Sequence, residues 1–99
     1  MTLTTDKNGS NLTVHLNGEL NTMTAPELSA LLNKELGGVQ ALTLDFKECD
    51  YVSSAGLRVL LATFKQMKAA KCTMRLANVG VNFMDVLQNT GLDAVFDMQ

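Results

Sequence analysis

The chain has 99 residues, of which 46% are apolar and 5% aromatic, and its formal net charge is −2 at neutral pH. This size predicts one domain over residues 1–99, with a two-layer core of helices on a sheet and little room for a large buried cavity. The charge shows no basic excess, which argues against affinity for nucleic acid through its phosphates.

The amino-terminal segment predicts a β-hairpin. Met1 to Asp6 is expected to form an edge strand, and Asn8-Gly9 is a strong turn signal after it. From Asn11 to Asn17 apolar and polar side chains alternate, which is the period of a strand with one buried face. The two strands are joined by a short turn and are therefore expected to pair antiparallel.

A first helix is expected after Thr24. Thr24 and Glu27 have the spacing of a capping box, and Pro26 falls in the first turn, where its missing N–H group costs nothing. Leucines then recur at helical spacing, and Gly37-Gly38 ends the helix. The nearly continuous apolar run from Val39 to Phe46 predicts a central strand covered on both faces.

A longer helix follows, because one stripe at helical spacing is apolar: Leu57, Leu60, Leu61, Phe64 and Met67. The alternation from Cys72 to Leu76 predicts a strand, Val81 to Gln88 a short helix, and Ala94 to Met98 a last strand. The fold class is therefore α/β, in the order β-β-α-β-α-β-α-β. We expect a mixed sheet with its helices packed mainly on one face.

The sequence favours a cytoplasmic location. No apolar run approaches the ~20 residues that a membrane-spanning helix needs, and the polar first ten residues lack the apolar centre of a secretory signal. Cys49 and Cys72 form no CxxC pair and are best explained as free, partly buried thiols in a reducing compartment. We expect a cytoplasmic protein that has no membrane as a partner.

The chain lacks a convincing catalytic set. It has no glycine-rich phosphate-binding motif, and Ser54 does not lie in the Gly-x-Ser-x-Gly motif of serine hydrolases. The single histidine, His15, is expected to face solvent from a strand rather than to act as a base or metal ligand. The acidic residues Asp45, Glu48 and Asp50 are expected to solvate a loop, with Mg²⁺ binding as the alternative. We expect neither enzymatic activity nor a metal or cofactor.

The segment from Ser53 to Leu57 opens the longer helix. A helix start carries unpaired N–H groups and a partial positive charge. Ser53 is suited to cap it, which would leave the hydroxyl of Ser54 directed outward beside these donors. Gly56 is a poor helix former, and its presence is explained if another group approaches the backbone closely. The simpler interpretation is that both serines only cap the helix.

Three segments resemble landmarks of STAS domains, and specifically of the bacterial anti-sigma factor antagonists: Gly18-Glu19-Leu20-Asn21, Val52-Ser53-Ser54-Ala55-Gly56-Leu57 and Asn89-Thr90-Gly91-Leu92. The three segments follow the family's order and span nearly the whole chain. In the family motif the phosphorylated serine stands two residues before Gly-Leu, and the residue that matches it is Ser54.

The resemblance implies a STAS-like fold and a regulatory function. The unmodified domain would bind an anti-sigma factor, which is usually also an ATP-dependent serine kinase, and would so release a sigma factor. Phosphorylation of Ser54 would end the complex, and a serine phosphatase would restore it. The expected partner-binding residues surround the acceptor: Leu20, Asn21, Met23, Ser53, Ser54, Ala55, Gly56 and Arg58.

Three of these residues keep an alternative. Leu20 and Met23 would supply apolar contact with the partner, unless they belong to the core. Arg58 lies four residues after Ser54, on the same helix face, where it would pair with a phosphate or a partner carboxylate unless it is only solvated.

The chain departs from the family pattern at two aspartates. Asn21 and Ser53 stand where members usually have aspartate, and Ala55 stands where many have a second Ser or Thr. The loss of two carboxylates leaves open a constitutive STAS subunit of a signalling or transport assembly that is never phosphorylated. A receiver-like domain phosphorylated on Asp45 is disfavoured, because such domains are longer and carry paired acidic residues after the first strand.

Overall fold

The structure, a computed structural model, describes residues 1–98, and Gln99, the last residue of the expected domain, lies outside the described residues. The element order confirms the predicted one. The elements are β1 (Thr2–Asn8), β2 (Asn11–Asn17), α1 (Ala25–Glu35), β3 (Ala41–Glu48), α2 (Ser54–Ala69), β4 (Thr73–Ala77), α3 (Val81–Thr90), the 3-10 helix η1 (Leu92–Ala94) and β5 (Asp97–Met98).

The five strands found in residues 1–98 form one mixed sheet in the order β1-β2-β3-β4-β5. The hairpin pairs β1 antiparallel to β2, and the other neighbours are parallel because a helix connects each pair. Gly9 closes the hairpin at φ +64°, a left-handed conformation that glycine adopts without steric cost. The predicted hairpin is therefore confirmed.

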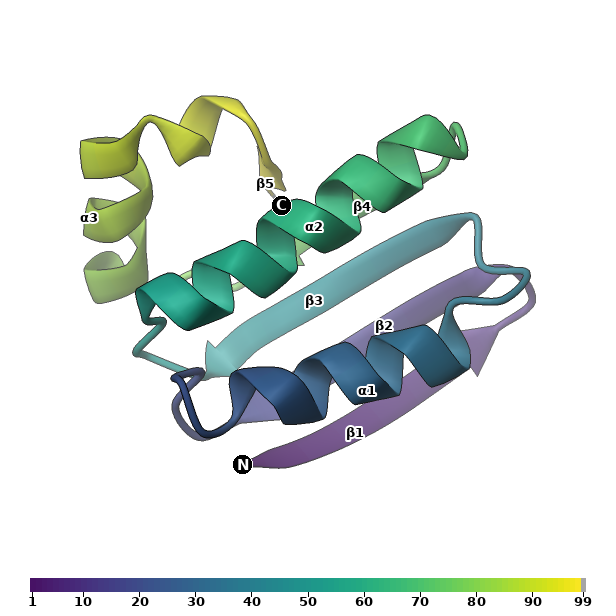
Figure 1. Cartoon of the computed structure of the whole chain (residues 1–99), viewed down its shortest axis with the longest axis horizontal. Helices are drawn as coiled ribbons and strands as arrows, with labels where there is room; N and C mark the ends of the chain where they lie inside the picture. Colours follow the sequence, from purple (N-terminus) through teal and green to yellow (C-terminus); the bar gives the residue numbers. More distant parts are fainter. Residues whose placement is uncertain (99) are drawn as a thin grey trace.

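One face of the sheet forms the core. Side chains of β2, β3 and β4 that share this face are buried: Leu12, Val14, Leu16, Leu42, Leu44, Phe46, Met74 and Leu76. Helices α1 and α2 lie side by side over this face, and α3 stands at one end of the sheet (Figure 1). The rings of Phe83 on α3 and Phe46 on β3 lie 4.9 Å apart, which joins α3 to the same core.

The expectation that the central strand is covered on both faces is wrong. On β3, Leu42 and Leu44 are buried, whereas Thr43 and Asp45 on the opposite face are only half-buried. The physical reason is that α1 and α2 both pack on the Leu42 side. A polar sheet face therefore remains open, as in sheets that are half solvated.

The last predicted strand is also shorter than expected. Gly91 ends α3 at φ +76°, and the chain then turns through η1, where the N–H of Phe96 donates to the carbonyl of Leu92 at 3.1 Å. Of residues 94–98, only Asp97–Met98 pairs with β4. Within residues 1–98, no helix combines the length and apolarity needed to cross a bilayer.

Candidate functional site

The loops that precede α1, α2 and α3 gather at one end of the molecule (Figure 1). This is the end where parallel strands β2, β3 and β4 finish, because each strand runs toward the start of the next helix. Sites in open α/β sheets lie at the carboxyl ends of the strands. The predicted site residues, which lie in the loop before α1 and around the start of α2, are therefore brought to one edge of the sheet.

Backbone hydrogen bonds join the loop before α1 to the loop before α2. The N–H of Leu20 donates to the carbonyl of Tyr51 at 2.9 Å, and the N–H of Ser53 donates back to the carbonyl of Leu20 at 2.8 Å. Leu20 and Val52 form an isolated parallel bridge. These contacts continue the pairing of β2 with β3 beyond the sheet and hold the start of α2 against the first loop.

The predicted cap of α2 is confirmed. Ser53 is the N-cap, in an extended conformation, and its hydroxyl oxygen accepts a hydrogen bond from the N–H of Gly56 at 3.4 Å. Ser54 is the first residue of the helix and is exposed. Its hydroxyl group lies at the end of α2 where unpaired N–H groups create partial positive charge.

The structure places Leu20 and Gly56 inside the protein, which corrects the expectation that they contact a partner. Leu20 is 0% exposed. A Cβ atom on Gly56 would lie 2.8 Å from Cγ of Leu20 and 2.9 Å from Cγ1 of Val52. The group that approaches the helix backbone closely is therefore Leu20 of the same chain.

Asn21 shapes the loop before α1. Its Oδ1 atom accepts hydrogen bonds from the N–H groups of Met23 at 2.9 Å and Thr24 at 3.1 Å. The hydroxyl of Thr24 donates to the carbonyl of Glu19 at 2.6 Å and accepts from the N–H of Asn21 at 2.8 Å. The expected capping box of Thr24 and Glu27 is therefore absent, because the Thr24 hydroxyl is used within the loop.

Three large apolar side chains are exposed at this end: Met23, Tyr51 and Val81, with exposed fractions of 82%, 52% and 78%. The Oδ2 atom of Asp50 accepts a hydrogen bond from Nδ2 of Asn82 at 2.8 Å. This bond links the start of α3, where Val81 lies, to the loop before α2. We call the set Met23, Tyr51, Ser54 and Val81 the apical face. Exposed apolar side chains that cluster on a polar domain mark interaction surfaces.

Sequence reasoning missed Tyr51 and Val81 as members of this face. Val81 precedes the buried stripe of Phe83 and Leu87 by two residues, so its helical position already placed it outside the core. Tyr51 gave a weaker signal, because it stands between exposed Asp50 and buried Val52 in a loop without periodicity.

The two remaining predicted residues lie beside the apical face. Ala55 is half-buried, and Arg58 is exposed on the next turn of α2. Arg58 lines a shallow groove between α1 and α2, together with Ser29 and Asn33 of α1. The ion pairs that the structure records in residues 1–98 both involve His15, so Arg58 is available to an external anion.

Two of the three acidic residues that were expected to solvate a loop, Asp50 and Asp45, have partners within the chain, whereas Glu48 is exposed. Asp50 bonds Asn82, and the Oδ1 atom of Asp45 accepts from Nδ2 of Asn78 at 2.8 Å and from the N–H of Lys47 at 3.0 Å. Within residues 1–98, no three His, Cys, Asp or Glu side chains are grouped as a metal site would require. Asp50 and Asp45 therefore help to position the loops that they contact.

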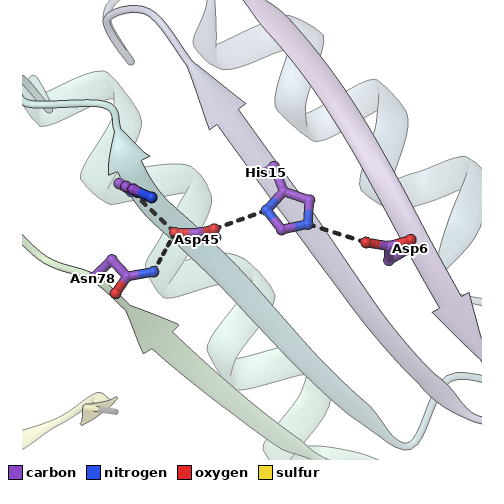
Figure 2. A network of polar contacts seen from close by, with 5 residues as sticks. Asp6, His15, Asp45 and Asn78 are labelled. Atoms are coloured by element: carbon purple, nitrogen blue, oxygen red, sulfur yellow. Dashed lines mark hydrogen bonds and ion pairs between the residues drawn. The ribbon is translucent and has the colours of Figure 1, made fainter.

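His15 does more than face solvent. Its Nδ1 lies 2.8 Å from Oδ2 of Asp45 on β3, and its Nε2 lies 3.3 Å from Oδ2 of Asp6 on β1 (Figure 2). The hydrogen bond with Asp45 is the main cause that raises the pKa of His15, while burial opposes it and the bond with Asp6 adds to it. Sequence alone missed this contact, because it joins three strands.

The two cysteines are free thiols, as expected. Cys49 is buried and Cys72 is half-buried. Burial raises the pKa of the Cys49 thiol above its ordinary value. A buried thiol with a raised pKa is a poor nucleophile, so Cys49 belongs to the core rather than to the apical face.

Both the sequence and the fold of the chain resemble those of known proteins. The STAS domain family model matches residues 2–99. BtrV of Bordetella bronchiseptica, provisionally named an anti-sigma factor antagonist, is 33% identical over 97 residues, covering 97% of this chain and 84% of BtrV. An anti-sigma factor antagonist from Mycobacterium paratuberculosis superposes with a TM-score of 0.87 at 23% identity, over 98% of this chain and 83% of that one.

The phosphorylated form of the Bacillus cell fate determinant SpoIIAA superposes with a TM-score of 0.78 at 18% identity, over 99% of this chain and 91% of that one. The structural matches share the mixed five-stranded sheet with three helices described above. The family model covers every residue of the apical face. The chain therefore belongs to the STAS domain family.

Proposed function

We propose that the chain is an anti-sigma factor antagonist whose apical face binds an anti-sigma factor while Ser54 is unmodified. The observation that carries the proposal is the exposure of Ser54 at the start of α2, together with the exposed side chains of Met23, Tyr51 and Val81 at the same end of the molecule. The name given to BtrV supports the same function, since BtrV is 33% identical over 97 residues.

The surface chemistry supports a protein partner. Met23, Tyr51 and Val81 present apolar area that water solvates poorly, and Met and Tyr are enriched in protein interfaces. The face is held by the backbone bridge of Leu20 with Val52 and by the Asp50–Asn82 hydrogen bond. A preformed face loses little conformational entropy when a partner binds.

Phosphorylation of Ser54 would spare the fold. A phosphate adds about −1.5 to −2 charges at neutral pH. At the amino end of α2 the helix dipole favours that charge by about 0.3–1 kcal/mol, so the domain tolerates it. No buried contact has to break, because Ser54 is exposed.

The same phosphate would disrupt the complex. A partner packed over Ser54 would desolvate a charged group, which costs several kcal/mol when no opposite charge compensates. At about 1.4 kcal/mol per tenfold change in affinity, binding weakens by more than a hundredfold. We propose that the anti-sigma factor is itself the serine kinase and that a serine phosphatase restores the unmodified form.

Asn21 and Ser53, which stand where the family usually has aspartate, maintain the conformation of their loops. Asn21 bonds the N–H groups of Met23 and Thr24 through its amide oxygen, and Ser53 caps α2 through its hydroxyl. Aspartate accepts hydrogen bonds at these positions by the same geometry. The departures therefore remove negative charge without removing the shape of the apical face.

The proposed modification is tested by incubating the protein with the anti-sigma factor kinase of the same organism and ATP. Intact mass is expected to rise by one phosphoryl group in the wild type and in Ser53→Ala, and to stay constant in Ser54→Ala. A wild-type protein that binds the anti-sigma factor and stays unmodified would contradict the switch and favour a constitutive STAS subunit. Phosphorylation that survives Ser54→Ala would place the acceptor elsewhere.

A further inference from the structure

A chain of polar contacts crosses the open face of the sheet (Figure 2). It runs from Asp6 on β1 through His15 on β2 to Asp45 on β3, and from Asp45 to Asn78 after β4. The strand register places His15 opposite Thr4 on one side and opposite Asp45 on the other. The imidazole is therefore the link between the edge strand and the centre of the sheet.

The number of protons on His15 decides how many of these bonds exist. Both partners are carboxylates, and an ionised carboxylate only accepts hydrogen bonds. A neutral imidazole has one N–H donor, so it can serve only one of Asp6 and Asp45. The doubly protonated imidazolium donates to both, at 2.8 Å to Asp45 and 3.3 Å to Asp6.

We propose that His15 is a proton-controlled clasp that ties edge strand β1 to central strand β3 across β2. The clasp is closed when the imidazole is charged. When His15 loses a proton, the shorter bond to Asp45 keeps the remaining N–H on Nδ1, and the lone pair of Nε2 then faces the Asp6 carboxylate. The contact with β1 opens, while the contact with β3 remains.

The charges around His15 favour the closed state. His15 contacts Asp6 of β1 and Asp45 of β3. The residue of β4 that is aligned with Asp45 is Ala77, which carries no charge. The cations on this sheet face are Lys47, two residues beyond Asp45, and Arg75, which aligns with Thr43 in the neighbouring row. Arg75 is opposite Asp97 of β5. The two carboxylates in direct contact therefore dominate.

The edge position of β1 gives the clasp a consequence. β1 pairs with β2 alone, and six of its seven residues are exposed. Edge strands present unpaired backbone groups that other chains can join, and their pairing is the first in a sheet to fray. A bond from His15 to Asp6 adds a side-chain attachment near the hairpin end of β1. Loss of this bond above the pKa of His15 makes β1 the pH-sensitive edge of the domain.

The experiment follows His15 by NMR from about pH 5 to pH 9, where histidine titrates. His15 is the single histidine, so its ring signals need no separate assignment. The wild-type midpoint is expected above the ordinary value of about 6.5. Asp6→Asn is expected to lower it and Asp45→Asn to lower it further. Asp97→Asn, which removes a carboxylate from the same sheet face without touching His15, is expected to leave it unchanged.

Amide hydrogen exchange of β1, corrected for the intrinsic pH dependence, reports the clasp itself. Protection of the β1 amides is expected to fall by about 1.5- to 5-fold as the pH rises and His15 loses a proton. This fold-change corresponds to the free energy of an exposed ion pair. In Asp6→Asn, whose side chain is 84% exposed in the wild type, this step is expected to vanish while the fold persists. Three results would each overturn the proposal. They are a wild-type midpoint at or below 6.5, an Asp6→Asn midpoint equal to that of Asp97→Asn, and protection of the β1 amides that does not change as His15 titrates.

Discussion

A Cβ atom on Gly56 would lie 2.8 Å from Cγ of Leu20, closer than real Cβ atoms approach a neighbour. The first turn of α2 and the loop before α1 therefore pack closely at Gly56, where only glycine fits without a shift of its neighbours. Because Leu20 fills the inner side of this turn, the side chain of Ser54 is left on the outer side. The close packing inside and the exposed hydroxyl outside are two consequences of one arrangement.

Gly56→Ala is expected to destabilise the protein by about 1–3 kcal/mol, because overpacking the contact with Leu20 and Val52 outweighs the gain of about 1 kcal/mol in helix propensity. Urea unfolding measures this change. Gly37→Ala is the control, since nothing lies within 4 Å of the added Cβ. Equal stability of Gly56→Ala and the wild type would show that the two loops are not closely packed.

Asn21→Asp is expected to fold as stably as the wild type, because a carboxylate accepts the same two hydrogen bonds from Met23 and Thr24. Asn21→Ala loses both bonds and is expected to cost about 0.5–2 kcal/mol, as the loss of a cap does. Thermal unfolding distinguishes the two. A stable Asn21→Ala variant would mean that Asn21 does not shape the loop.

Met23→Ser is expected to weaken binding of the anti-sigma factor by about tenfold or more, as the truncation of a central interface residue does. The melting temperature should stay constant, since the Met23 side chain is 82% exposed. Val95→Ser is the matched control, because Val95 is an exposed apolar residue outside the apical face, with an exposed fraction of 41%. Equal losses in calorimetry from both variants would argue against the apical face as the docking surface.

Asp45→Asn is expected to destabilise the protein by about 1–3 kcal/mol near pH 6, because the amide satisfies its neighbours incompletely. Burial alone would raise the pKa of Asp45, but hydrogen bonds from Asn78, Lys47 and His15 together lower it. A lowered pKa in the folded state gives stability above the unfolded value of 3.8, and this stability is lost as the pH falls through the folded pKa.

Urea unfolding of the wild type and Asp45→Asn across this pH range measures the difference. The two curves should converge in acid, below the unfolded value. Asp97→Asn serves as the exposed control on the same sheet face, with a difference of about 0.5 kcal/mol or less at every pH. A gap between the wild type and Asp45→Asn that stays constant into acid would show that the Asp45 charge contributes nothing.

Local patterns predicted most of the fold because they reflect one face or one turn. The alternation from Asn11 to Asn17 matched β2, and Ser53 capped α2 as its position indicated. The two errors in the strands arose where the pattern was ambiguous. The run from Val39 to Phe46 contains Thr43 and Asp45, whose polarity is consistent with one open face. The segment from Ala94 reads as a strand, although Ala94 belongs to the 3-10 helix η1.

The site was less predictable because its contacts join distant segments. Leu20 and Met23 lie three residues apart in the same loop, and no sequence pattern distinguishes them. Leu20 is buried because it packs against Gly56 and Val52, whereas Met23 is exposed. The bond of His15 to Asp45 depends on the register of β2 with β3, which no local pattern determines.

Negative charge at Ser54 is expected to leave the domain folded and to disrupt binding of the anti-sigma factor to the apical face. Isothermal calorimetry of the anti-sigma factor with wild type, Ser54→Ala and Ser54→Asp tests it most directly, with melting temperatures measured in parallel. Unchanged melting temperatures, strong binding by wild type and Ser54→Ala, and binding by Ser54→Asp that is weaker by about a hundredfold are the predicted result. Equal affinity of Ser54→Asp and wild type would show that charge at Ser54 does not control binding.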